Sequence, residues 1–371
     1  MKNVLITGGA GFIGSHLADN LFKSGKYNIT ILDNLSEKTH SNSWPRYLNE
    51  SFNLIYGDVT DRKALTNALE SIDIVFHLAA ELDLNPEYQR FMNVNVGSTA
   101  LLFEIIKKNK LKIEKVLIAS TQFVYGNGLW TNSDGEKFYP KNRSIDDKML
   151  WDFYENGEKL VYNLCDETQK INPPNHYALS KYFQEKLALN LGELNEIDVR
   201  VLRFSIIHGV RQSIKNTYSG ALRTLCYFAN LKQPFSTFED NKSLRDFTPV
   251  YDAVEACRIV LEEGSPFEIY NISNGKPISV FQLAEMISGE FSIKSDFSKK
   301  VEWRHGDIRH AISNNKKISD LGFMPLHEEK NVVKEYVKWF KKQNLDFERF
   351  ELTQEKMRQN GQIRSLKDYN N

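Results

Sequence analysis

Tyr177 and Lys181 are the side chains whose types and spacing most clearly suggest acid–base chemistry. They stand four residues apart in the stretch Tyr-Ala-Leu-Ser-Lys, so in a helix both would lie on one face. A phenol with a pKa near 10 is a poor base at neutral pH, but an ammonium one turn away favours its ionised form. The pair therefore predicts a tyrosine base acting on a hydroxyl group. The spacing alone leaves one alternative open, in which the Tyr and the Lys share an ordinary helix face and have no catalytic role.

A glycine-rich turn near the N-terminus predicts what lies beside that pair. An apolar run (4–7) is followed by Gly-Gly-Ala-Gly-Phe-Ile-Gly (8–14), a helical pattern, and a second apolar run that ends in Asp33. The first glycines permit a tight turn, Gly11 lets backbone amides approach a pyrophosphate, and Gly14 lets the helix pack against the strand. The pyrophosphate also gains from the positive end of the helix dipole. Together these features predict a dinucleotide site, in preference to a plain strand–helix turn.

The residues around Asp33 indicate which dinucleotide to expect. Asp33 follows Gly14 at about the 20-residue separation at which an acid binds the adenosine ribose hydroxyls. The stretch Asp-Asn-Leu-Ser (33–36) holds neither Arg nor Lys, and a 2′-phosphate would meet a carboxylate there. The sequence therefore favours NAD over NADP.

Thr121 is the third candidate for chemistry. It follows an apolar run in Ala-Ser-Thr-Gln-Phe-Val-Tyr-Gly (119–126), and the carboxyl ends of parallel strands open onto the ligand crevice. We expect its hydroxyl to bind the reacting hydroxyl and to relay or steady the proton, with a strand-capping threonine as the alternative. Weaker candidates for cofactor contacts are Asp58, the run Leu-Ala-Ala (78–80) and Asn95.

Strand-like and helical patterns alternate through the first two hundred residues. Such alternation is typical of a parallel sheet covered by helices on both faces, so we expect an α/β fold with a Rossmann-type doubly wound sheet. After Asp33 the expected strands lie at 52–56, 72–76, 115–119 and 199–204, and the expected helices near 61–70, 91–108 and 177–191. A late strand near 267–271 is expected to return to the same sheet.

Three parts are expected along the chain: a Rossmann domain (1–204), a smaller mixed C-terminal substrate domain (205–345) and a polar tail (346–371). The segment 127–172 interrupts the first of them and is rich in polar residues and aromatics. A structureless loop of this length is improbable in a compact domain, so we predict an insertion or lid packed near the site, or else a decorated surface loop. The tail is expected to be a short amphipathic helix with Phe350, Leu352 and Met357, or a frayed end.

Composition argues against several classes of partner. The 48 Lys and Arg residues balance the 48 Asp and Glu residues, so no basic surplus indicates nucleic acid or an anionic membrane. No apolar run approaches the ~20 residues that a membrane span needs, and the chain opens on a strand without a secretory leader. Three scattered cysteines indicate reduced thiols and no metal site. We expect a cytoplasmic protein without nucleic-acid or membrane partners.

The motifs together resemble the extended short-chain dehydrogenase/reductases, and more narrowly the NAD-dependent nucleotide-sugar epimerase/dehydratase group. The stretches that carry this resemblance in the cofactor half are 7–14, Gly-Asp-Val (57–59), His-Leu-Ala-Ala (77–80), Asn-Val-Gly-Ser (95–98), Ser-Thr…Val-Tyr-Gly (120–126) and Tyr177…Lys181. Beyond it, 243–252, 270–277, 306–309 and 321–325 match C-terminal landmarks of the group. The resemblance covers residues 1 to about 340.

The resemblance implies bound NAD, a nucleoside-diphosphate sugar substrate and a homodimer formed through the helices near 91–108 and 177–191. It implies catalytic roles for Thr121, Tyr177 and Lys181. The expected cofactor contacts are Gly8, Gly11, Phe12, Ile13, Gly14, Asp33, Asn34, Ser36, Asp58, Val59, Leu78, Ala79, Ala80, Asn95, Ser120, Tyr177 and Lys181. The expected substrate contacts are Gln122, Ser205, Arg211, Arg245, Arg304 and Asp307, because a diphosphate needs cations, with surface salt bridges as the alternative for the charged residues. Ser205 stands where members usually have an asparagine that contacts the sugar diphosphate.

The resemblance also bears on the reaction. Members begin alike, with a hydride taken by NAD from a sugar carbon, commonly C4, while the tyrosine takes the hydroxyl proton. The 4,6-dehydratases carry an Asp-Glu pair directly after the catalytic threonine, whereas this chain has Gln122 and Phe123, which cannot transfer that proton. This favours 4-epimerisation. The members that act on dTDP-L-rhamnose and related deoxysugars are the most similar, and the stretches that carry this similarity are 125–128, 135–143, 166–174 and 209–220. A reductase, dehydrogenase, dehydratase or decarboxylase is the alternative; the Thr121, Tyr177 and Lys181 set argues against a non-catalytic NAD sensor.

Overall fold

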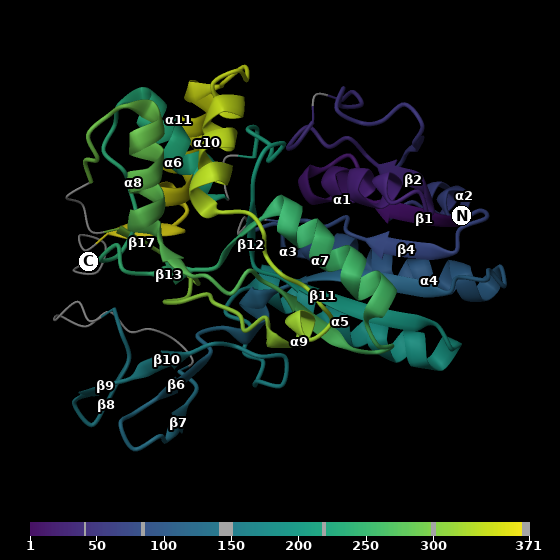
Figure 1. Ribbon diagram of the computed structural model, residues 1–371, viewed down its shortest axis with the longest axis horizontal. Coiled ribbons are helices and arrows are strands. Elements are labelled where there is room, and N and C mark those ends of the chain that lie inside the picture. Colours follow the sequence, from purple (N-terminus) through teal and green to yellow (C-terminus); the bar gives the residue numbers. More distant parts are fainter. Residues whose placement is uncertain (41, 83–85, 141–150, 217–219, 298–301, 366–371) are drawn as a thin grey trace.

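The computed structural model describes residues 1–40, 42–82, 86–140, 151–216, 220–297 and 302–365 (Figure 1). Its centre is a seven-stranded sheet with the order β15-β11-β5-β4-β1-β2-β3, in which all neighbours are parallel. The strands are β1 (Lys2–Thr7), β2 (Tyr27–Asp33), β3 (Asn53–Tyr56), β4 (Ile74–His77), β5 (Lys115–Thr121), β11 (Asp198–Phe204) and β15 (Ile269–Ile272). This confirms the predicted α/β fold with a doubly wound parallel sheet.

The strand order reverses beside β1. The chain runs outward from β1 through β2 to β3, then crosses back to β4 on the other side of β1. In such sheets the connections leave on opposite faces at the reversal, and the carboxyl ends of the strands border a ligand crevice there. The glycine turn after β1 and the residues after β4 and β5 therefore meet at one edge.

Helices cover both faces of the sheet. Successive apolar side chains of β1 point to opposite faces, so each face needs an apolar cover. Val4 and Ile6 pack in one cluster with Leu17 of α1, while Leu5 packs in the other with Leu102 of α4. The helices of this part are α1 (Phe12–Lys23), α2 (Arg62–Ala68), α3 (Tyr88–Phe91), α4 (Ser98–Lys108), α5 (His176–Asn195) and α7 (Val250–Glu263), with a π-helical turn η1 (Met92–Gly97) before α4. The sheet is thus packed between two apolar layers, and the residues that follow its strands take their positions from it.

The described part of the segment 127–172 forms a small antiparallel sheet of its own, seen at the lower left of Figure 1. Its strands are β6 (Leu129–Thr131), β7 (Lys137–Phe138) and β10 (Val161–Asn163), beside the hairpin β8 (Tyr154–Glu155) and β9 (Glu158–Lys159). Trp130 is 1% exposed and stacks on His310, which attaches the small sheet to the C-terminal part. Residues 141–150 of this segment lie outside the described residues.

The C-terminal part consists of helices and short paired strands. Its helices are α6 (Ala221–Leu231), α8 (Val280–Phe291), α9 (Lys316–Ser319), α10 (Glu329–Phe340) and α11 (Phe347–Gln359). Helices α6, α8, α10 and α11 lie together at the end of the molecule opposite the N-terminus, whereas α9 lies beside the parallel sheet (Figure 1). Its strands are β12 (Ile206–His208), β13 (Leu244–Arg245), β14 (Phe247–Pro249), β16 (Ile278–Ser279), β17 (Glu302–Arg304) and β18 (Ile363–Ser365). Residues 217–219, within the predicted run 209–220, lie outside the described residues.

The predicted tail is largely a packed helix. Phe350 of α11 is 1% exposed and stacks on Tyr227 at 4.5 Å between ring centroids, and Met357 is also buried. Leu352, which the amphipathic pattern assigned to the same face, is exposed instead. Residues 347–359 therefore form a packed helix and not a frayed end. Residues 366–371 lie outside the described residues.

In the part of the chain that the structure describes, no helix has the length and apolarity needed to cross a membrane. Cys165, Cys226 and Cys257 are buried, and none of the three forms a disulfide. No group of three or more His, Cys, Asp or Glu side chains among the described residues is arranged to hold a metal ion.

Candidate active site

A cavity of about 1050 Å³ lies at the carboxyl edge of the parallel sheet. Residues at or just after the ends of β1, β2, β4, β5 and β11 line it on one side, and residues of α6, β13 and β17 line it on the other. The cavity thus joins the sheet to the C-terminal part. It is where the fold brings together most of the residues that the sequence singled out.

All but two of the predicted site residues line this cavity. Those that do are Gly8, Gly11, Phe12, Ile13, Gly14, Asp33, Asn34, Ser36, Asp58, Val59, Leu78, Ala79, Ala80, Ser120, Thr121, Tyr177, Lys181, Ser205, Arg211, Arg245, Arg304 and Asp307. The glycine turn, the tyrosine–lysine pair and the arginines are therefore parts of one site, although up to three hundred residues separate them in sequence.

Asn95 and Gln122 are the exceptions, and both side chains are buried. Asn95 accepts the Glu81 N–H at 2.9 Å and donates to Ser180 Oγ at 2.9 Å, which ties the chain after β4 to α5. The amide oxygen of Gln122 accepts from Ser313 Oγ at 3.1 Å. Neither residue lines the cavity, and their contacts with cofactor and substrate stay predictions.

The turn between β1 and α1 has the shape that a pyrophosphate site needs. Gly8 has a φ of +70°, and a Cβ there would lie 3.0 Å from the backbone N and Cα of Ala79. A Cβ on Gly14 would lie 2.5 Å from the carbonyl oxygen of Gly8, so only glycine lets α1 approach the strand this closely. Helix α1 begins at Phe12, and its N-cap residue, Gly11, provides no side-chain hydrogen bond. Its first N–H groups are thus left for an anion.

Asp33 ends β2 and faces the same space. It is 8% exposed, and its carboxylate accepts the N–H groups of Ala10 (3.1 Å) and Leu35 (2.9 Å). Burial raises the pKa of Asp33, and the two backbone donors oppose that shift. These bonds hold the carboxylate next to the glycine turn, where it can accept from a pair of ribose hydroxyls.

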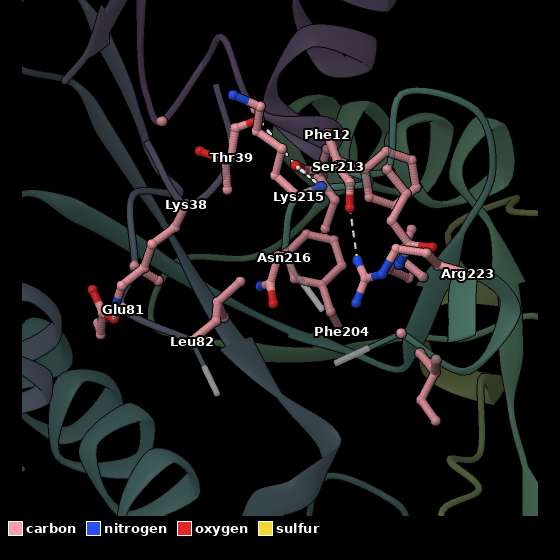
Figure 2. A pocket seen from close by; sticks show the side chains of 18 of the residues that line it. Phe12, Lys38, Thr39, Glu81, Leu82, Phe204, Ser213, Lys215, Asn216 and Arg223 are labelled. Atoms are coloured by element: carbon pink, nitrogen blue, oxygen red, sulfur yellow. Dashed lines mark hydrogen bonds and ion pairs between the residues drawn. The ribbon is translucent and has the colours of Figure 1, made fainter. Parts of the chain in front are cut away.

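Lys38 is a lining cation that the prediction of NAD over NADP did not consider. Its ammonium pairs with Glu81 at 2.6 Å and with Glu87 at 3.2 Å, and Figure 2 shows Lys38 and Glu81 side by side at the cavity wall. Two carboxylates therefore offset its charge. The surroundings of Asp33 still favour a ribose hydroxyl over a 2′-phosphate.

Tyr177 and Lys181 lie one turn apart on α5, and both line the cavity. Asn175 caps the helix by accepting the Ala178 N–H at 2.9 Å, which fixes the turn that carries Tyr177. Lys181 is 1% exposed, and its Nζ donates to Gln184 Oε1 at 2.5 Å. Burial lowers the pKa of Lys181 to about 7, and the negative charge of Glu185 opposes this shift.

A buried ion pair below this helix face is a part of the site that sequence reasoning missed. Glu185 and Arg203 are 0% and 2% exposed at their side chains and lie 2.7 Å apart. Ser120, the neighbour of Thr121, donates to Glu185, and Arg203 donates to Tyr125 OH at 3.0 Å. The pair fastens α5 to the ends of β5 and β11. A charged residue inside the apolar run of β11 was the available signal.

Thr121 ends β5 and is 5% exposed at the cavity. Its Oγ1 accepts the Phe123 N–H at 3.3 Å and so begins the short 3₁₀ turn η2 (Gln122–Tyr125). The strand-capping alternative is therefore part of what this hydroxyl does. Capping and substrate contact are compatible, because a hydroxyl that accepts one hydrogen bond still carries a proton to donate.

Cations gather where the C-terminal part borders the cavity. Arg211 pairs with Asp19 at 2.9 Å, Arg245 pairs with Asp307 at 3.3 Å, and the Arg304 guanidinium lies 5.3 Å from the Phe238 ring centroid. Arg223 and Lys215 also line the cavity and were not predicted; Figure 2 shows both, with Arg223 donating to the Ser213 carbonyl at 2.7 Å. Five cations on this side of the cavity suit a diphosphate.

Comparison with known proteins finds similarity along most of the chain. The model of the NAD dependent epimerase/dehydratase family matches residues 4–144 and 153–273. The chain is 30% identical to dTDP-L-rhamnose 4-epimerase of Burkholderia thailandensis over 335 residues, 87% of this chain and 91% of that protein. It is 29% identical to a putative UDP-glucose 4-epimerase of Methanocaldococcus jannaschii, over 92% of this chain and 99% of that protein. Other relatives are 4,6-dehydratases and a decarboxylase.

A solved structure agrees with this placement. The crystal structure of UDP-glucose 4-epimerase from Thermotoga maritima with UDP-glucose superposes with a TM-score of 0.74 at 25% identity, over 92% of this chain and 99% of that chain. The similarity extends over both the parallel sheet and the C-terminal part, and so includes both walls of the cavity.

Proposed function

Because the chain belongs to the NAD-dependent epimerase/dehydratase family, we propose that it is a nucleotide-sugar 4-epimerase that inverts C4 of a nucleoside-diphosphate deoxysugar. The observation that carries the proposal is the placement of Thr121, Tyr177 and Lys181 around one cavity that also holds a dinucleotide turn. The family shows an enzyme of nucleotide-sugar chemistry, and the choice of epimerisation and of substrate is our proposal.

The cavity residues fit NAD. The uncapped start of α1 would meet the pyrophosphate, the Asp33 carboxylate would accept from the adenosine ribose, and Lys181 would bind the second ribose. The chemistry supplied by bound NAD is the removal and return of one hydride at C4, through a transient ketone of the sugar. The shape of the glycine turn, where a Cβ would collide with the neighbouring backbone, supports this fit.

The residues of this chain would move the proton. Tyr177 would accept the proton of the C4 hydroxyl as a phenolate and return it to the inverted oxygen. Lys181, one turn along α5, would stabilise that phenolate by its charge. Thr121 would donate to the same sugar oxygen and hold it in line with Tyr177.

The residues after Thr121 favour epimerisation over elimination of water. Gln122 has no titratable proton, and its amide already accepts from Ser313 in the interior. Phe123 is apolar, although it lines the cavity. Neither side chain can act as the acid that expels a hydroxyl group as water. The ketone is therefore left to take the hydride back on its opposite face.

The substrate and the assembly are parts of the same proposal. The five cations where the C-terminal part borders the cavity support a nucleoside-diphosphate handle. The first sugar to test is dTDP-L-rhamnose, because one relative is a dTDP-L-rhamnose 4-epimerase. We propose a homodimer through the outer face of α5, where Leu179 and Phe183 are 40% and 42% exposed one turn apart. Sedimentation velocity that gives a monomer at micromolar concentration would contradict the dimer.

The test of the proposed reaction needs no added cofactor if NAD stays bound. Purified protein is incubated with dTDP-L-rhamnose and, separately, with UDP-glucose, and the products are followed by NMR. We expect the C4 epimer of one of them to form without a net change in absorbance from NADH. Stoichiometric NADH, loss of water from the sugar or loss of CO₂ from a uronic acid substrate would instead support the alternative reactions.

A further inference from the structure

We propose that Ser205 selects the sugar by accepting a hydrogen bond from a hydroxyl or amide N–H group of the substrate. This inference rests on the proposed function and names a specificity-determining contact within it. Ser205 directly follows β11, is 8% exposed and lines the cavity. Its preceding residue, Phe204, pairs in register with Thr121, so Ser205 stands one residue beyond the level of the proposed reaction centre.

The Ser205 hydroxyl is attached to a buried chain of polar groups. Its Oγ lies 2.6 Å from Thr248 Oγ1, and Thr248 Oγ1 lies 3.1 Å from Asp246 Oδ1. The Asn274 N–H donates to the same Thr248 oxygen at 3.0 Å. Thr248 and Asp246 are both 0% exposed, so these contacts are made without water from the surface.

Counting protons fixes the direction of the hydrogen bonds that lead from Ser205 through Thr248 to Asp246. A threonine hydroxyl has one proton to donate and can accept two hydrogen bonds. Asn274 supplies one of the donors that Thr248 accepts, and the carboxylate of Asp246 draws the single Thr248 proton. The remaining acceptor position on Thr248 is then filled by the Ser205 proton. The opposite direction would take a donor away from a buried carboxylate, which is unfavourable.

This direction is that of the ionised form of Asp246, which prevails at pH values above its pKa. Burial raises the pKa of Asp246 to about 6, so both forms occur near neutral pH. The other carboxylate oxygen, Oδ2, contacts Ser273 Oγ, and Ser273 Oγ lies 3.1 Å from the Ser313 carbonyl. A proton on Oδ2 can therefore be donated to Ser273, which passes its own to Ser313. Oδ1 then continues to accept from Thr248, whereas a proton on Oδ1 would be donated to Thr248 and would reverse the direction, so the binding measurements belong at about pH 8.

Ser205 Oγ therefore presents two lone pairs, and no proton, to the cavity. Phosphate oxygens also accept hydrogen bonds, so they are disfavoured partners, whereas a sugar hydroxyl or an N-acyl amide can donate. An asparagine, the residue expected here from the family resemblance, would offer two N–H donors instead. The buried chain from Ser205 to Asp246 thus assigns Ser205 to the sugar and not to the diphosphate.

Binding of dTDP and dTDP-L-rhamnose to the NAD-loaded protein, measured by calorimetry, tests the assignment. We expect Ser205→Ala to weaken dTDP-L-rhamnose about three- to tenfold, the range of one neutral hydrogen bond, and to leave dTDP affinity within about twofold. Thr248→Val should weaken binding of dTDP-L-rhamnose by a similar factor, because Ser205 can then turn its proton toward the cavity. Thr248→Ser keeps the hydroxyl, so this variant should bind dTDP-L-rhamnose like the unaltered protein. Equal losses for both ligands, or no loss for either, would overturn the proposal.

A second measurement uses the unaltered protein and so does not depend on whether a variant folds. Monodeoxy and monofluoro analogues of the dTDP-sugar are compared at each ring position, because fluorine cannot donate a hydrogen bond. At one position the fluoro analogue should bind as poorly as the deoxy analogue. If every fluoro analogue binds like the parent sugar, the assignment of Ser205 is wrong. Absence of epimerisation by the unaltered protein would contradict the proposed function separately.

Discussion

The ammonium of Lys181 lies 2.5 Å from the side-chain oxygen of Gln184, three residues further along α5. The Gln184 amide nitrogen in turn donates to Thr99 Oγ1 of α4 at 2.9 Å. The lysine that is expected to assist Tyr177 is therefore anchored to the neighbouring helix. An anchored ammonium keeps a fixed position relative to the phenol, which a mobile lysine would not.

Gln184→Met should lower kcat roughly tenfold, because the Lys181 ammonium loses an acceptor while the volume of the site is nearly kept. Turnover of the identified nucleotide sugar, measured with saturating NAD, checks this. Lys186→Met on the same helix is the matched control, since Lys186 is exposed and does not line the cavity. Equal kcat values for the two variants would show that the anchor has no role in turnover.

Lys181 should also leave a signature in the pH dependence of stability. Its pKa is lowered by burial to about 7 from 10.5, so between these values the unfolded chain binds a proton that the folded chain does not. Folding therefore gains stability from this group as the pH rises through that interval. The free energy of unfolding of the ligand-free protein should rise, relative to Lys181→Met, between about pH 6.5 and about pH 9. Urea denaturation of both proteins checks this, and parallel pH profiles would contradict the lowered pKa.

Asp33→Ala should weaken NAD binding at least about tenfold, because a charge-assisted hydrogen bond to the ribose is lost. Asp33→Asn is the matched comparison: its amide oxygen can still accept the Ala10 N–H, but the charge is gone. Titration of NAD followed by fluorescence or calorimetry gives both affinities. Unaltered affinity in the alanine variant would remove Asp33 from the ribose site.

Gly14→Ala and Gly289→Ala should have opposite effects on stability. A Cβ at Gly14 would lie 2.5 Å from the Gly8 carbonyl oxygen, so α1 must move and the protein should lose roughly 1–3 kcal/mol. Gly289 lies in α8 with nothing within 4 Å of the added Cβ, so alanine there should stabilise by about 0.5–1 kcal/mol. Denaturant unfolding measures both, and equal changes would contradict the close approach of α1 to the strand.

Local patterns carried the sequence predictions that agree with the structure. The glycine turn and the Tyr177–Lys181 spacing depend on residues close in sequence, and both were found at the cavity. The inward turn of Asn95 and Gln122 depends on distant partners, Ser180 and Ser313, which no local pattern reveals. Buried polar chains are the features that sequence reasoning finds least readily.

The Glu185–Arg203 pair and the Ser205–Thr248 contact were missed for the same reason. Each joins residues that topology alone brings together: α5 with β11 in the first, and β14 with the chain end of β11 in the second. From sequence, a charged residue in an apolar strand indicates only that some partner exists. The identity of that partner requires the fold.

The most direct test of the whole account is the variant Tyr177→Phe. It removes one hydroxyl, so NAD should remain bound with an affinity close to that of the unaltered protein. Epimerisation of the nucleotide sugar should fall roughly 10²- to 10⁴-fold, the range of general acid–base catalysis. Turnover by Tyr177→Phe at the rate of the unaltered enzyme, with NAD bound, would show that another group moves the proton and would contradict the proposed mechanism.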